Sequence, residues 1–346
     1  MFSHPLRECS VGHTGCAHDD GMTATVPLAA SAGADVATLR VIGKTVVAED
    51  VMTLELAAPS GGRLRDWTPG SHIDLRLPNG MTRQYSLCGD RWDPTTYRVG
   101  VLREPAGHGG SAFVHDELSV GDVVGVAGPR NNFPLVPSDS YLFVAGGIGI
   151  TPLLPMIAQA DLLGADWRLL YGGRRRASMA FLDELEAYGD RVLIRPQDEH
   201  GLLDLAGYLG EPRPGVRIYA CGPGPLLAAM EATCAGWPAH TLRTERFVAD
   251  ETGAAVRTTP FEVELARTGA TVTVTPDMTI LDALGQVGVE VLTSCRRGVC
   301  GTCETTVLAG RPDHRDALLD DDERDTADFM YVCVSRCATD RLVLDL

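Results

Sequence analysis

The pattern of hydrophobic and polar positions changes along the chain and divides it into three folded blocks. From residue 37 to 138, short alternating runs are separated by turn residues, which is typical of a β-barrel. From 139 to 250, apolar strands alternate with amphipathic helices, and this order predicts a parallel sheet covered by helices. From 258 to 346, two amphipathic strands, a short helix and a cysteine-rich loop predict a small α+β domain.

Two segments lack such periodicity. Residues 1–36 hold small and polar residues, and we expect a flexible N-terminal extension; residues 251–257 have the composition of a linker. Five side chains in the extension could ligate a metal, but no short Cys-x2-Cys or His-x3-His pair supports that use, and a disordered leader is the preferred interpretation. These five are His4, Cys9, His13, Cys16 and His18.

Charge and cysteine content narrow the class of protein. The formal net charge of −16 argues against a nucleic-acid binder, which would carry basic patches. No apolar run is long enough for a membrane span and no secretory signal stands at the N-terminus, so we expect a cytoplasmic protein. Ten cysteines in a long, core-rich chain indicate metal ligands rather than a disulfide framework.

Four cysteines have a diagnostic spacing. Cys295-x4-Cys300-x2-Cys303, followed by the distant Cys333, is the plant-type 2Fe–2S pattern. Gly298 and Gly301 would let the loop wrap closely, and the strand-like segment YVCVSRC would return the fourth thiolate. The alternative is a zinc ribbon that uses Cys337, but it leaves Cys295 idle and the glycines unexplained; Cys337 is interpreted as a non-ligand.

The middle block carries features of a nucleotide site. Gly147 and Gly149 lie in a strand, turn and helix start, where backbone N–H groups and the helix dipole favour a diphosphate. Cys221 closes a later strand in the turn ACGPG and would face the nicotinamide, although such a turn is often only a turn. The basic run 174–176 is either a solvated turn or a site for a ribose or 2′-phosphate.

An electron count requires a further cofactor. Nicotinamide gives two electrons as hydride whereas a 2Fe–2S centre takes one, so a flavin should stand between them, in the barrel. Arg83-x-Tyr85-Ser86 lies on a predicted strand, and Gly109-Gly110-Ser111 opens a short helix that could bind a phosphate. Alone, the strand pattern is weak, because a strand arginine is usually a surface residue.

In this order the three blocks resemble the phthalate dioxygenase reductase family, which includes vanillate demethylase reductases. The resemblance covers about 37–346 and rests on RQYSL, GHGGS, PRNNFPL, VAGGIGITP, YACGP, SCRRGVCGTC, DHRD, DDE and CVSR. It implies an FMN-binding barrel of ferredoxin-reductase type, an NAD(P)-binding α/β domain and a C-terminal β-grasp ferredoxin domain.

The resemblance also implies roles for single residues. The flavin ring and phosphate would be held by Arg83, Tyr85 and Ser86, with Ser86 near the reactive edge, and by Gly109, Gly110 and Ser111. The nucleotide site would be lined by Gly147, Gly149 and Thr151, with Arg174 beside it. Phe247 would cover the isoalloxazine face. NADH is the expected donor, but the 174–176 run leaves NADPH open.

The interpretation is therefore an electron-transfer reductase that passes electrons from NAD(P)H through FMN and a 2Fe–2S cluster. Its partner would be the terminal component of a multicomponent oxygenase, of the Rieske non-haem iron type. A reductase for a haem monooxygenase and a zinc-stabilised binding module are the alternatives. Six acidic residues between 320 and 328 either form a solvated helical turn or steer a basic partner.

Overall fold

The computed structural model describes residues 36–105, 107, 109–247, 256–319 and 321–346. Their strands form three larger sheets and one two-stranded ribbon. Residues 1–35 of the predicted extension, with its five candidate metal ligands, lie outside the described residues. So does most of the predicted linker, and so does Asp320 at the start of the acidic run.

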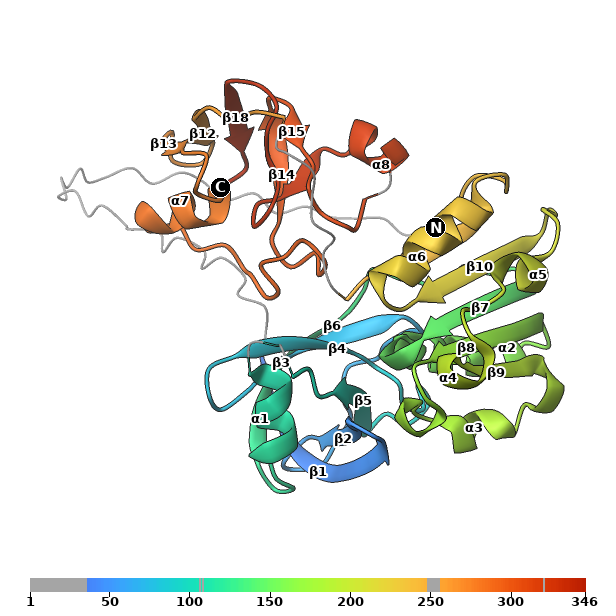
Figure 1. The fold of residues 1–346 in the computed structure, drawn as a ribbon. Coiled ribbons are helices and arrows are strands. Elements are labelled where there is room, and N and C mark those ends of the chain that lie inside the picture. Colours follow the sequence, from blue (N-terminus) through green and yellow to red (C-terminus); the bar gives the residue numbers. More distant parts are fainter. Residues whose placement is uncertain (1–35, 106, 108, 248–255, 320) are drawn as a thin grey trace, which may run out of the picture. The chain divides into compact units, whose positions relative to one another are not determined.

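Six antiparallel strands build the first sheet, in the order β4-β3-β6-β1-β2-β5 (Figure 1). A bridge between Leu87, directly after β4, and Val99 on β5 joins the two edges and closes the sheet as a barrel. Leu54 and Leu56 point into its core whereas Glu55 between them is exposed, as the period of two requires. The elements are β1 (Ala37–Ala48), β2 (Val51–Ala57), β3 (Ser71–Arg76), β4 (Thr82–Ser86), β5 (Thr96–Leu102), α1 (Gly110–Asp116) and β6 (Val123–Asn131).

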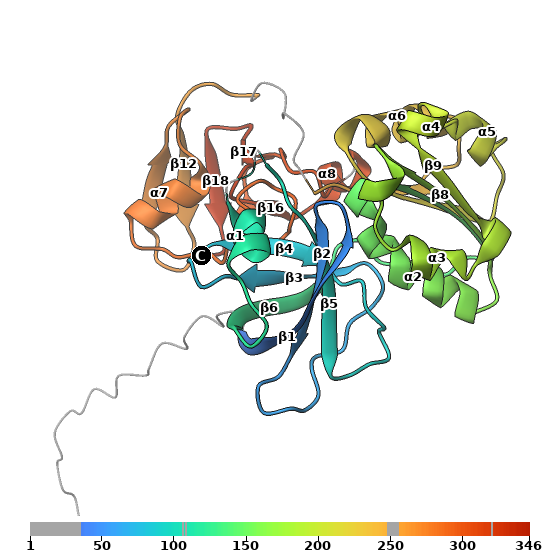
Figure 2. The ribbon, with the colours of Figure 1, turned by 60° about the horizontal axis from the view of Figure 1, so that its bottom comes forward.

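The second sheet is parallel, in the order β11-β10-β7-β8-β9. Figure 2 shows it between α2 and α3 on one face and α5 and α6 on the other, which are the two sides of its hydrophobic core. The strands are β7 (Ser140–Gly146), β8 (Asp166–Gly173), β9 (Val192–Pro196), β10 (Val216–Cys221) and β11 (Leu242–Glu245). The helices are α2 (Ile150–Leu162), α3 (Leu182–Glu186), α4 (Gln197–His200), α5 (Leu205–Leu209) and α6 (Gly224–Cys234), with 3-10 turns η1 (Gly147–Gly149), η2 (Arg176–Ser178) and η3 (Gly189–Arg191).

One predicted helix is shorter than its sequence pattern. The apolar spacing predicts a helix through Met179–Gly189, but α3 covers only Leu182–Glu186. Phe181 adopts a left-handed backbone, with φ of 63°, which interrupts the helix on its N-terminal side. The Phe181 side chain is buried in the core, so tertiary packing decides this boundary.

The third sheet is mixed, in the order β13-β12-β18-β14-β16, with β12 and β18 parallel and the other pairs antiparallel. Helix α7 packs on it and shares its core, which is separate from the cores of the other two sheets. The elements are β12 (Phe261–Leu265), β13 (Thr271–Val274), α7 (Ile280–Gln286), β14 (Glu304–Ala309), α8 (Asp321–Thr326), β16 (Phe329–Tyr331), β18 (Arg341–Leu344) and the ribbon β15 (Pro312–Asp313) with β17 (Arg336–Cys337).

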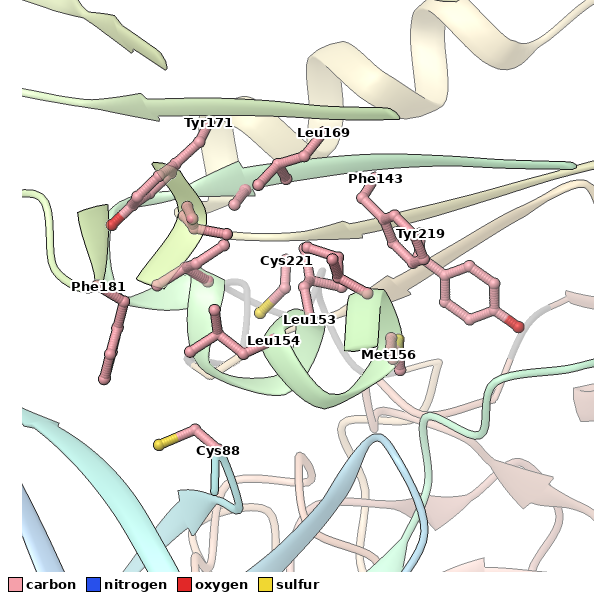
Figure 3. Close-up of a cluster of buried hydrophobic side chains, with 14 of the residues drawn as sticks. Cys88, Phe143, Leu153, Leu154, Met156, Leu169, Tyr171, Phe181, Tyr219 and Cys221 are labelled. Carbon is pink, nitrogen blue, oxygen red and sulfur yellow. The ribbon is translucent and has the colours of Figure 1, made fainter. Parts of the chain in front are cut away.

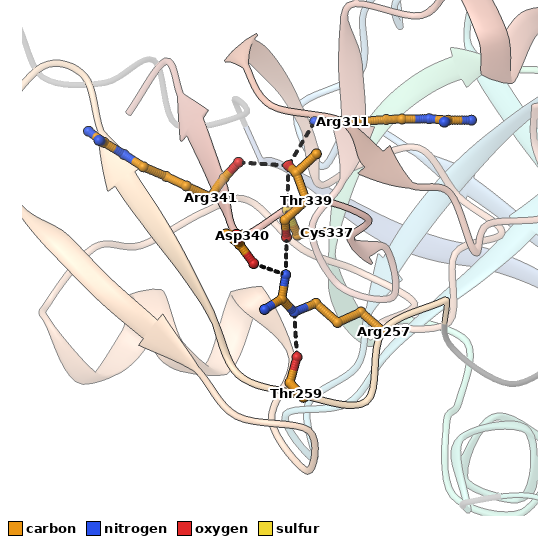
Figure 4. Close-up of polar contacts among 7 residues, drawn as sticks. All are labelled: Arg257, Thr259, Arg311, Cys337, Thr339, Asp340 and Arg341. Atoms are coloured by element: carbon orange, nitrogen blue, oxygen red, sulfur yellow. Dashed lines mark hydrogen bonds and ion pairs between the residues drawn. The ribbon is translucent and has the colours of Figure 1, made fainter.

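Arg257 ties the start of this domain to the turn before β18 (Figure 4). Its guanidinium donates to the Thr339 carbonyl oxygen at 2.9 Å and to Thr259 Oγ1 at 2.6 Å, and it pairs with Asp340. The Cys337 thiol donates to the same Thr339 carbonyl at 3.0 Å.

No helix in the described part of the chain has the length and apolar character to span a bilayer; α2, the longest, has 13 residues.

Candidate functional site

The cysteine loop runs from the end of α7 to the start of β14 and carries Cys295, Cys300 and Cys303. Gly298 and Gly301 have φ of 70° and 72°, the left-handed region that favours glycine. A Cβ at Gly298 would also lie 2.6 Å from Val334 Cγ2 and 3.0 Å from Asp316 Cα, so the loop lies flat against a neighbouring segment. The glycines therefore make the tight wrap that the spacing predicts.

Backbone amides in this loop point at the sulfurs. Arg297 N–H donates to Cys295 Sγ at 3.3 Å, and Thr302 N–H donates to Cys300 Sγ at 3.4 Å. Hydrogen bonds of this kind stabilise thiolates and tune the reduction potential of a cluster. Both donors immediately follow a left-handed residue, so the turn geometry and the hydrogen bonds depend on each other.

The four thiols are neighbours in pairs rather than ligands around one point. Cys295 interacts with Cys300 and with Cys333, and Cys333 interacts with Cys303. Among the residues that the structure describes, no three His, Cys, Asp or Glu side chains are grouped as ligands of a single ion. The adjacent Cys295 thiol and burial raise the pKa of Cys300, so an adjacent cationic iron centre would be needed to hold both as thiolates. Two linked thiol pairs fit the two irons of a 2Fe–2S cluster.

Cys333 does not lie on a strand, contrary to the prediction for YVCVSRC. It lies in the turn between β16 and β17, because the chain leaves β16 after Tyr331 and Val334 N–H and Ser335 N–H both donate back to the Tyr331 carbonyl. The turn brings the Cys333 thiol to Cys295 and Cys303. Cys337, on β17, is fully buried and bonds to Thr339; within the described contacts it has no link to the four thiols.

The predicted phosphate residues come together at the start of α1. Gly109 is the N-cap in a left-handed conformation, with φ of 81°. A Cβ at Gly110 would collide with the Arg83 guanidinium, so glycine lets the β4 arginine lie against the helix start. The Ser111 hydroxyl accepts a hydrogen bond from Glu104 N–H at 3.0 Å. The Arg83 guanidinium thus lies beside the first turn of α1, and a cation next to a helix N-terminus is what a site for an anion requires.

The glycine turn after β7 is shaped mainly by close packing. A Cβ at Gly149 would collide with the Cys221 carbonyl, because the ends of β7 and β10 lie side by side. Gly147 has φ of 54° and open space where its Cβ would be. Thr151 is buried, and its hydroxyl donates to the Ile148 carbonyl at 3.0 Å, which holds the turn.

In the basic run 174–176 after β8, Arg174 and Arg175 have different surroundings. Arg175 pairs with Glu49 at 2.7 Å, so its charge is already met by the barrel. Arg174 is exposed, and in the described part of the chain no ion pair involves its side chain. Since β8 lies beside β7 in the parallel sheet, Arg174 follows the strand end next to the glycine turn.

Three polar side chains meet where the barrel joins the parallel sheet. Ser86, at the end of β4, and Cys221, at the end of β10, both donate to the Glu245 carboxyl group; the Cys221 Sγ to Glu245 oxygen distance is 3.9 Å. Figure 3 shows Cys221 among apolar side chains that include Leu153 and Leu154 of α2. Burial raises the pKa of Glu245 to about 8, and burial together with the Glu245 charge raises that of Cys221. Glu245 therefore holds a proton at neutral pH.

Sequence reasoning missed Glu245, although an indication was present. It is the last residue of β11 and pairs in register with Cys221 at the end of β10. Because parallel strands end at one edge of a sheet, the residue that ends the strand next to that of Cys221 was a candidate for the same site.

Two predicted flavin contacts lie nearby in the fold. Phe247 is partly buried against the core that contains Cys221. Burial of Tyr85 on β4 raises the pKa of the Tyr85 hydroxyl, which keeps that hydroxyl protonated.

Comparison with known proteins places this arrangement in a family. Residues 263–338 match the Fer2 model, the 2Fe–2S iron-sulfur cluster binding domain. The chain is 45% identical over 310 residues to phenoxybenzoate dioxygenase subunit beta of Ectopseudomonas oleovorans, covering 89% of this chain and 97% of that protein. It is 38% identical over 314 residues to phthalate dioxygenase reductase of Burkholderia cepacia, covering 89% and 97%. The chain belongs to the phthalate dioxygenase reductase family.

Solved structures agree with this assignment. A phthalate dioxygenase reductase structure, titled as a modular structure for electron transfer from pyridine nucleotides to [2Fe–2S], superposes with a TM-score of 0.67 at 37% identity and covers 90% of this chain and 98% of that one. An intact type IV self-sufficient cytochrome P450 monooxygenase gives a TM-score of 0.85 at 41% identity over 90% of this chain. This chain spans 41% of the length of the P450 protein.

Membership in the phthalate dioxygenase reductase family confirms the predicted architecture. The protein is an oxidoreductase with a flavin-binding barrel, a nucleotide-binding α/β domain and a 2Fe–2S ferredoxin domain. The zinc-ribbon alternative is wrong, because the Fer2 match spans the loop with all four predicted ligands and the thiol pairs exclude Cys337.

Proposed function

We propose that this chain is the reductase component of a multicomponent oxygenase, using NADH, FMN and a 2Fe–2S cluster to supply electrons to a separate terminal oxygenase. The observation that carries the proposal is the presence, in one chain, of the Ser86–Cys221–Glu245 centre and the four-thiol loop. The first joins the flavin barrel to the nucleotide sheet, and the second is a one-electron site. We propose the domain bounds 37–138, 139–250 and 258–346.

The residues that would hold the cofactors differ in chemistry. Arg83 with Gly109–Ser111 suits a single terminal phosphate, which favours FMN, and Tyr85 and Phe247 offer aromatic surfaces for the ring. Gly147 leaves open space beside the turn for the nucleotide, while Gly149 and Thr151 keep the turn in place. When bound, the flavin would supply two-electron chemistry and the cluster one-electron chemistry.

The residues at the junction share one buried carboxyl group, that of Glu245. Ser86 and Cys221 are buried and both are oriented by Glu245, so their positions are set before any ligand arrives. A neutral Glu245 avoids a negative charge beside an electron-rich ring and keeps a proton close to Ser86. We therefore assign Ser86 and Cys221 to contact the reacting rings and Glu245 to position them.

We propose a Rieske-type non-haem iron oxygenase as the partner. Support comes from relatives of nearly the same length that are named as parts of dioxygenase systems, so that the oxygenase is another chain. A haem monooxygenase is the second candidate, because this chain matches part of a self-sufficient P450. Supplying purified oxygenases of each type with NADH and this protein, and measuring product, decides between them.

The core of the proposal is tested on the protein alone. We expect heat to release FMN, and NADH to bleach both the flavin and the cluster absorbance in an anaerobic titration. FAD in the released fraction would overturn the FMN assignment. A cluster that stays oxidised under excess NADH would overturn the electron route.

Donor choice is tested at the end of β8. We expect NADH to be used better than NADPH, because Arg175 is paired with Glu49 and leaves Arg174 alone for a 2′-phosphate. Arg174→Ala should change kcat/KM for NADPH more than for NADH, and Arg175→Ala should change the two equally. Predominant NADPH use that collapses in Arg174→Ala would contradict the NADH assignment.

A further inference from the structure

The segment that follows β6 contacts the cysteine loop. Asn132, directly after β6, donates a hydrogen bond from its side-chain Nδ2 to the backbone carbonyl oxygen of Cys300, at 3.0 Å. Cys300 is one of the four predicted cluster ligands, and its sulfur accepts a hydrogen bond from Thr302 N–H at 3.4 Å. The Asn132 bond therefore joins the barrel to the backbone of a residue that would hold the cluster.

Gly301 makes room for this contact. A Cβ at Gly301 would lie 3.0 Å from Asn132 Nδ2, which is tighter than ordinary van der Waals contact. Gly301 also has φ of 72°, so the turn that presents the Cys300 carbonyl favours glycine for two reasons. The Asn132 amide thus lies directly against the backbone of the loop at this turn.

The residues on either side of Asn132 are held in place. Asn131 Nδ2 donates to the Pro69 carbonyl oxygen at 2.9 Å, and Asn131 Oδ1 accepts from Phe133 N–H at 2.9 Å. Phe133 is buried, and its ring meets that of Tyr219 on β10 edge-on, with 5.4 Å between the ring centroids. Asn132 itself is exposed, so its replacement removes the contact to the loop without opening a cavity.

Asn132 is close in the fold to the end of the predicted flavin strand. His72 on β3 is in register with Ser86 at the end of β4 and with Arg130 on β6. Neighbouring strands lie about 4.8 Å apart, so Ser86 and Arg130 are separated by two strand spacings, about 10 Å. Asn132 comes two residues after Arg130. The Asn132 contact therefore holds the cysteine loop at the end of the barrel that carries Ser86.

A polar network connects β6 to the flavin strand. Asp74 on β3 accepts hydrogen bonds from Arg130 on β6 at 2.6 Å and from Gln84 on β4 at 2.9 Å. Gln84 lies within the predicted flavin-binding motif of β4. The side chain of Asp74 is only 4% exposed, so water competes little for these bonds. The position of the β6 end is thus coupled to the strand that would bind the flavin.

We propose that Asn132 is a positioning residue for electron transfer from the flavin to the cluster. Its amide holds the Cys300–Gly301 turn against the barrel and so sets the distance between the two redox groups. This rests on the proposed function, because it names the residue that places the cluster on that electron route. In each transfer one electron leaves the reduced flavin and converts one iron of the cluster from iron(III) to iron(II), while the Asn132 amide gains and loses no proton.

Two variants remove the contact in different ways. Asn132→Ala removes the donor, and Asn132→Asp keeps the shape of the side chain but places an acceptor opposite the Cys300 carbonyl oxygen. Asn79→Ala is the matched control, because Asn79 is also an exposed asparagine of the barrel that makes a hydrogen bond, from Met81 N–H at 3.1 Å. Asn79 lies in the turn between β3 and β4, at the opposite end of β4 from Ser86.

Flash photoreduction measures the internal transfer without NADH. Photoexcited deazaflavin, with EDTA as the electron donor, reduces the bound flavin, and the following bleaching of the cluster absorbance gives the first-order rate. Loss of one hydrogen bond of ordinary strength should slow this transfer by about fivefold in Asn132→Ala, and Asn132→Asp should be at least as slow. The control should stay within about twofold of the unchanged protein. Redox titration should give unchanged reduction potentials, because Asn132 bonds to a carbonyl oxygen and to no sulfur.

The outcomes separate this inference from the proposed function. If both Asn132 variants transfer electrons as fast as Asn79→Ala, the contact does not position the cluster and the inference is wrong. If the reduction potential of the cluster falls enough to account for a slower transfer, Asn132 tunes the cluster instead of placing it, and the inference is also wrong. If NADH fails to reduce the flavin of the unchanged protein, the proposed function fails, while the flash rates still decide the role of Asn132.

Discussion

The Glu245 carboxyl group is buried where the barrel and the parallel sheet meet, so its protonation reports on the structure of this site. Ser86 and Cys221 both donate to it, yet burial outweighs these bonds and raises its pKa to about 8. An unfolded glutamate titrates near its ordinary pKa of about 4.3. Between these two values the folded protein keeps a proton that the unfolded chain has lost, so stability falls as pH rises through this window.

Glu245→Gln should remove that loss. Relative to the unchanged protein, we expect the variant to gain unfolding free energy from pH 5 to pH 8, by up to about 4 kcal/mol at the upper end. Urea unfolding at several pH values, followed by flavin fluorescence, measures the difference. Glu231→Gln, at a glutamate whose side chain is 49% exposed and paired with Arg246, should stay within about 1 kcal/mol throughout. A pH-independent difference for Glu245→Gln would contradict the assignment.

Cys303→Ser should abolish a stable cluster, because three thiolates hold two irons poorly. We expect the cluster bands and the electron paramagnetic resonance signal of the reduced centre to be lost. Reduction of cytochrome c should be largely lost, because that acceptor takes single electrons from the cluster, while ferricyanide is still reduced by the flavin. Cys337→Ser is the matched control, since Cys337 is also buried and its hydrogen bonds within the described residues go to Thr339. Loss of the cluster in Cys337→Ser would require a new ligand set.

At the scale of single elements, the turn from β7 to α2 shows two glycines needed for different reasons. Gly147 has a left-handed backbone with room for a side chain, whereas Gly149 has an ordinary helical φ of −61° and no room. The first glycine is required by conformation and the second by the Cys221 carbonyl. Substitution by alanine therefore separates the two causes.

Gly149→Ala should be the more harmful change. Overpacking against the Cys221 backbone should cost about 1–3 kcal/mol and push β10 away from the turn, which raises KM for NADH. Gly147→Ala should cost about 1 kcal/mol from its φ alone. Thermal unfolding and NADH steady-state kinetics of the two variants measure both effects. Equal destabilisation with unchanged KM in both would show that the close approach of Gly149 to β10 is unimportant.

On the scale of the whole molecule, separate cores carry the barrel and the ferredoxin domain. Leu54 lies in the core of the first and Leu284 in the core of the second, and both are fully buried. A domain with its own core unfolds largely by itself, so damage to one core should leave the cofactor of the other in place.

Leu284→Ala should therefore lower the temperature at which the cluster absorbance is lost, by an amount that reflects about 2–5 kcal/mol, and leave the temperature of flavin release unchanged. Leu54→Ala should do the reverse. Heating each variant while recording both signals is sufficient. A joint shift of both transitions in either variant would show that the domains unfold as one unit.

Several features of this protein follow from sequence alone because they depend on local spacing. The proposed cluster ligands Cys295, Cys300 and Cys303 lie in one short loop, so their spacing alone predicts the geometry of the site. The change from alternating to helical periodicity likewise predicts that a barrel is followed by a parallel sheet, and the structure has these two sheets in that order. The role of Gly298 could also be predicted from the sequence, because a loop that wraps tightly around sulfurs requires a residue without a side chain.

Tertiary structure decided what depends on contacts between distant segments. Glu245 meets Ser86 and Cys221 only because β4 ends at the junction and β10 and β11 end in register, and its pKa follows from that enclosure. The early start expected for α3 was overridden by burial of Phe181. Arg175 forms an ion pair with Glu49 of the barrel, and no local sequence pattern predicts this pairing. Local spacing encodes a site that one loop can build, whereas burial and pairing between strands are properties of the folded chain.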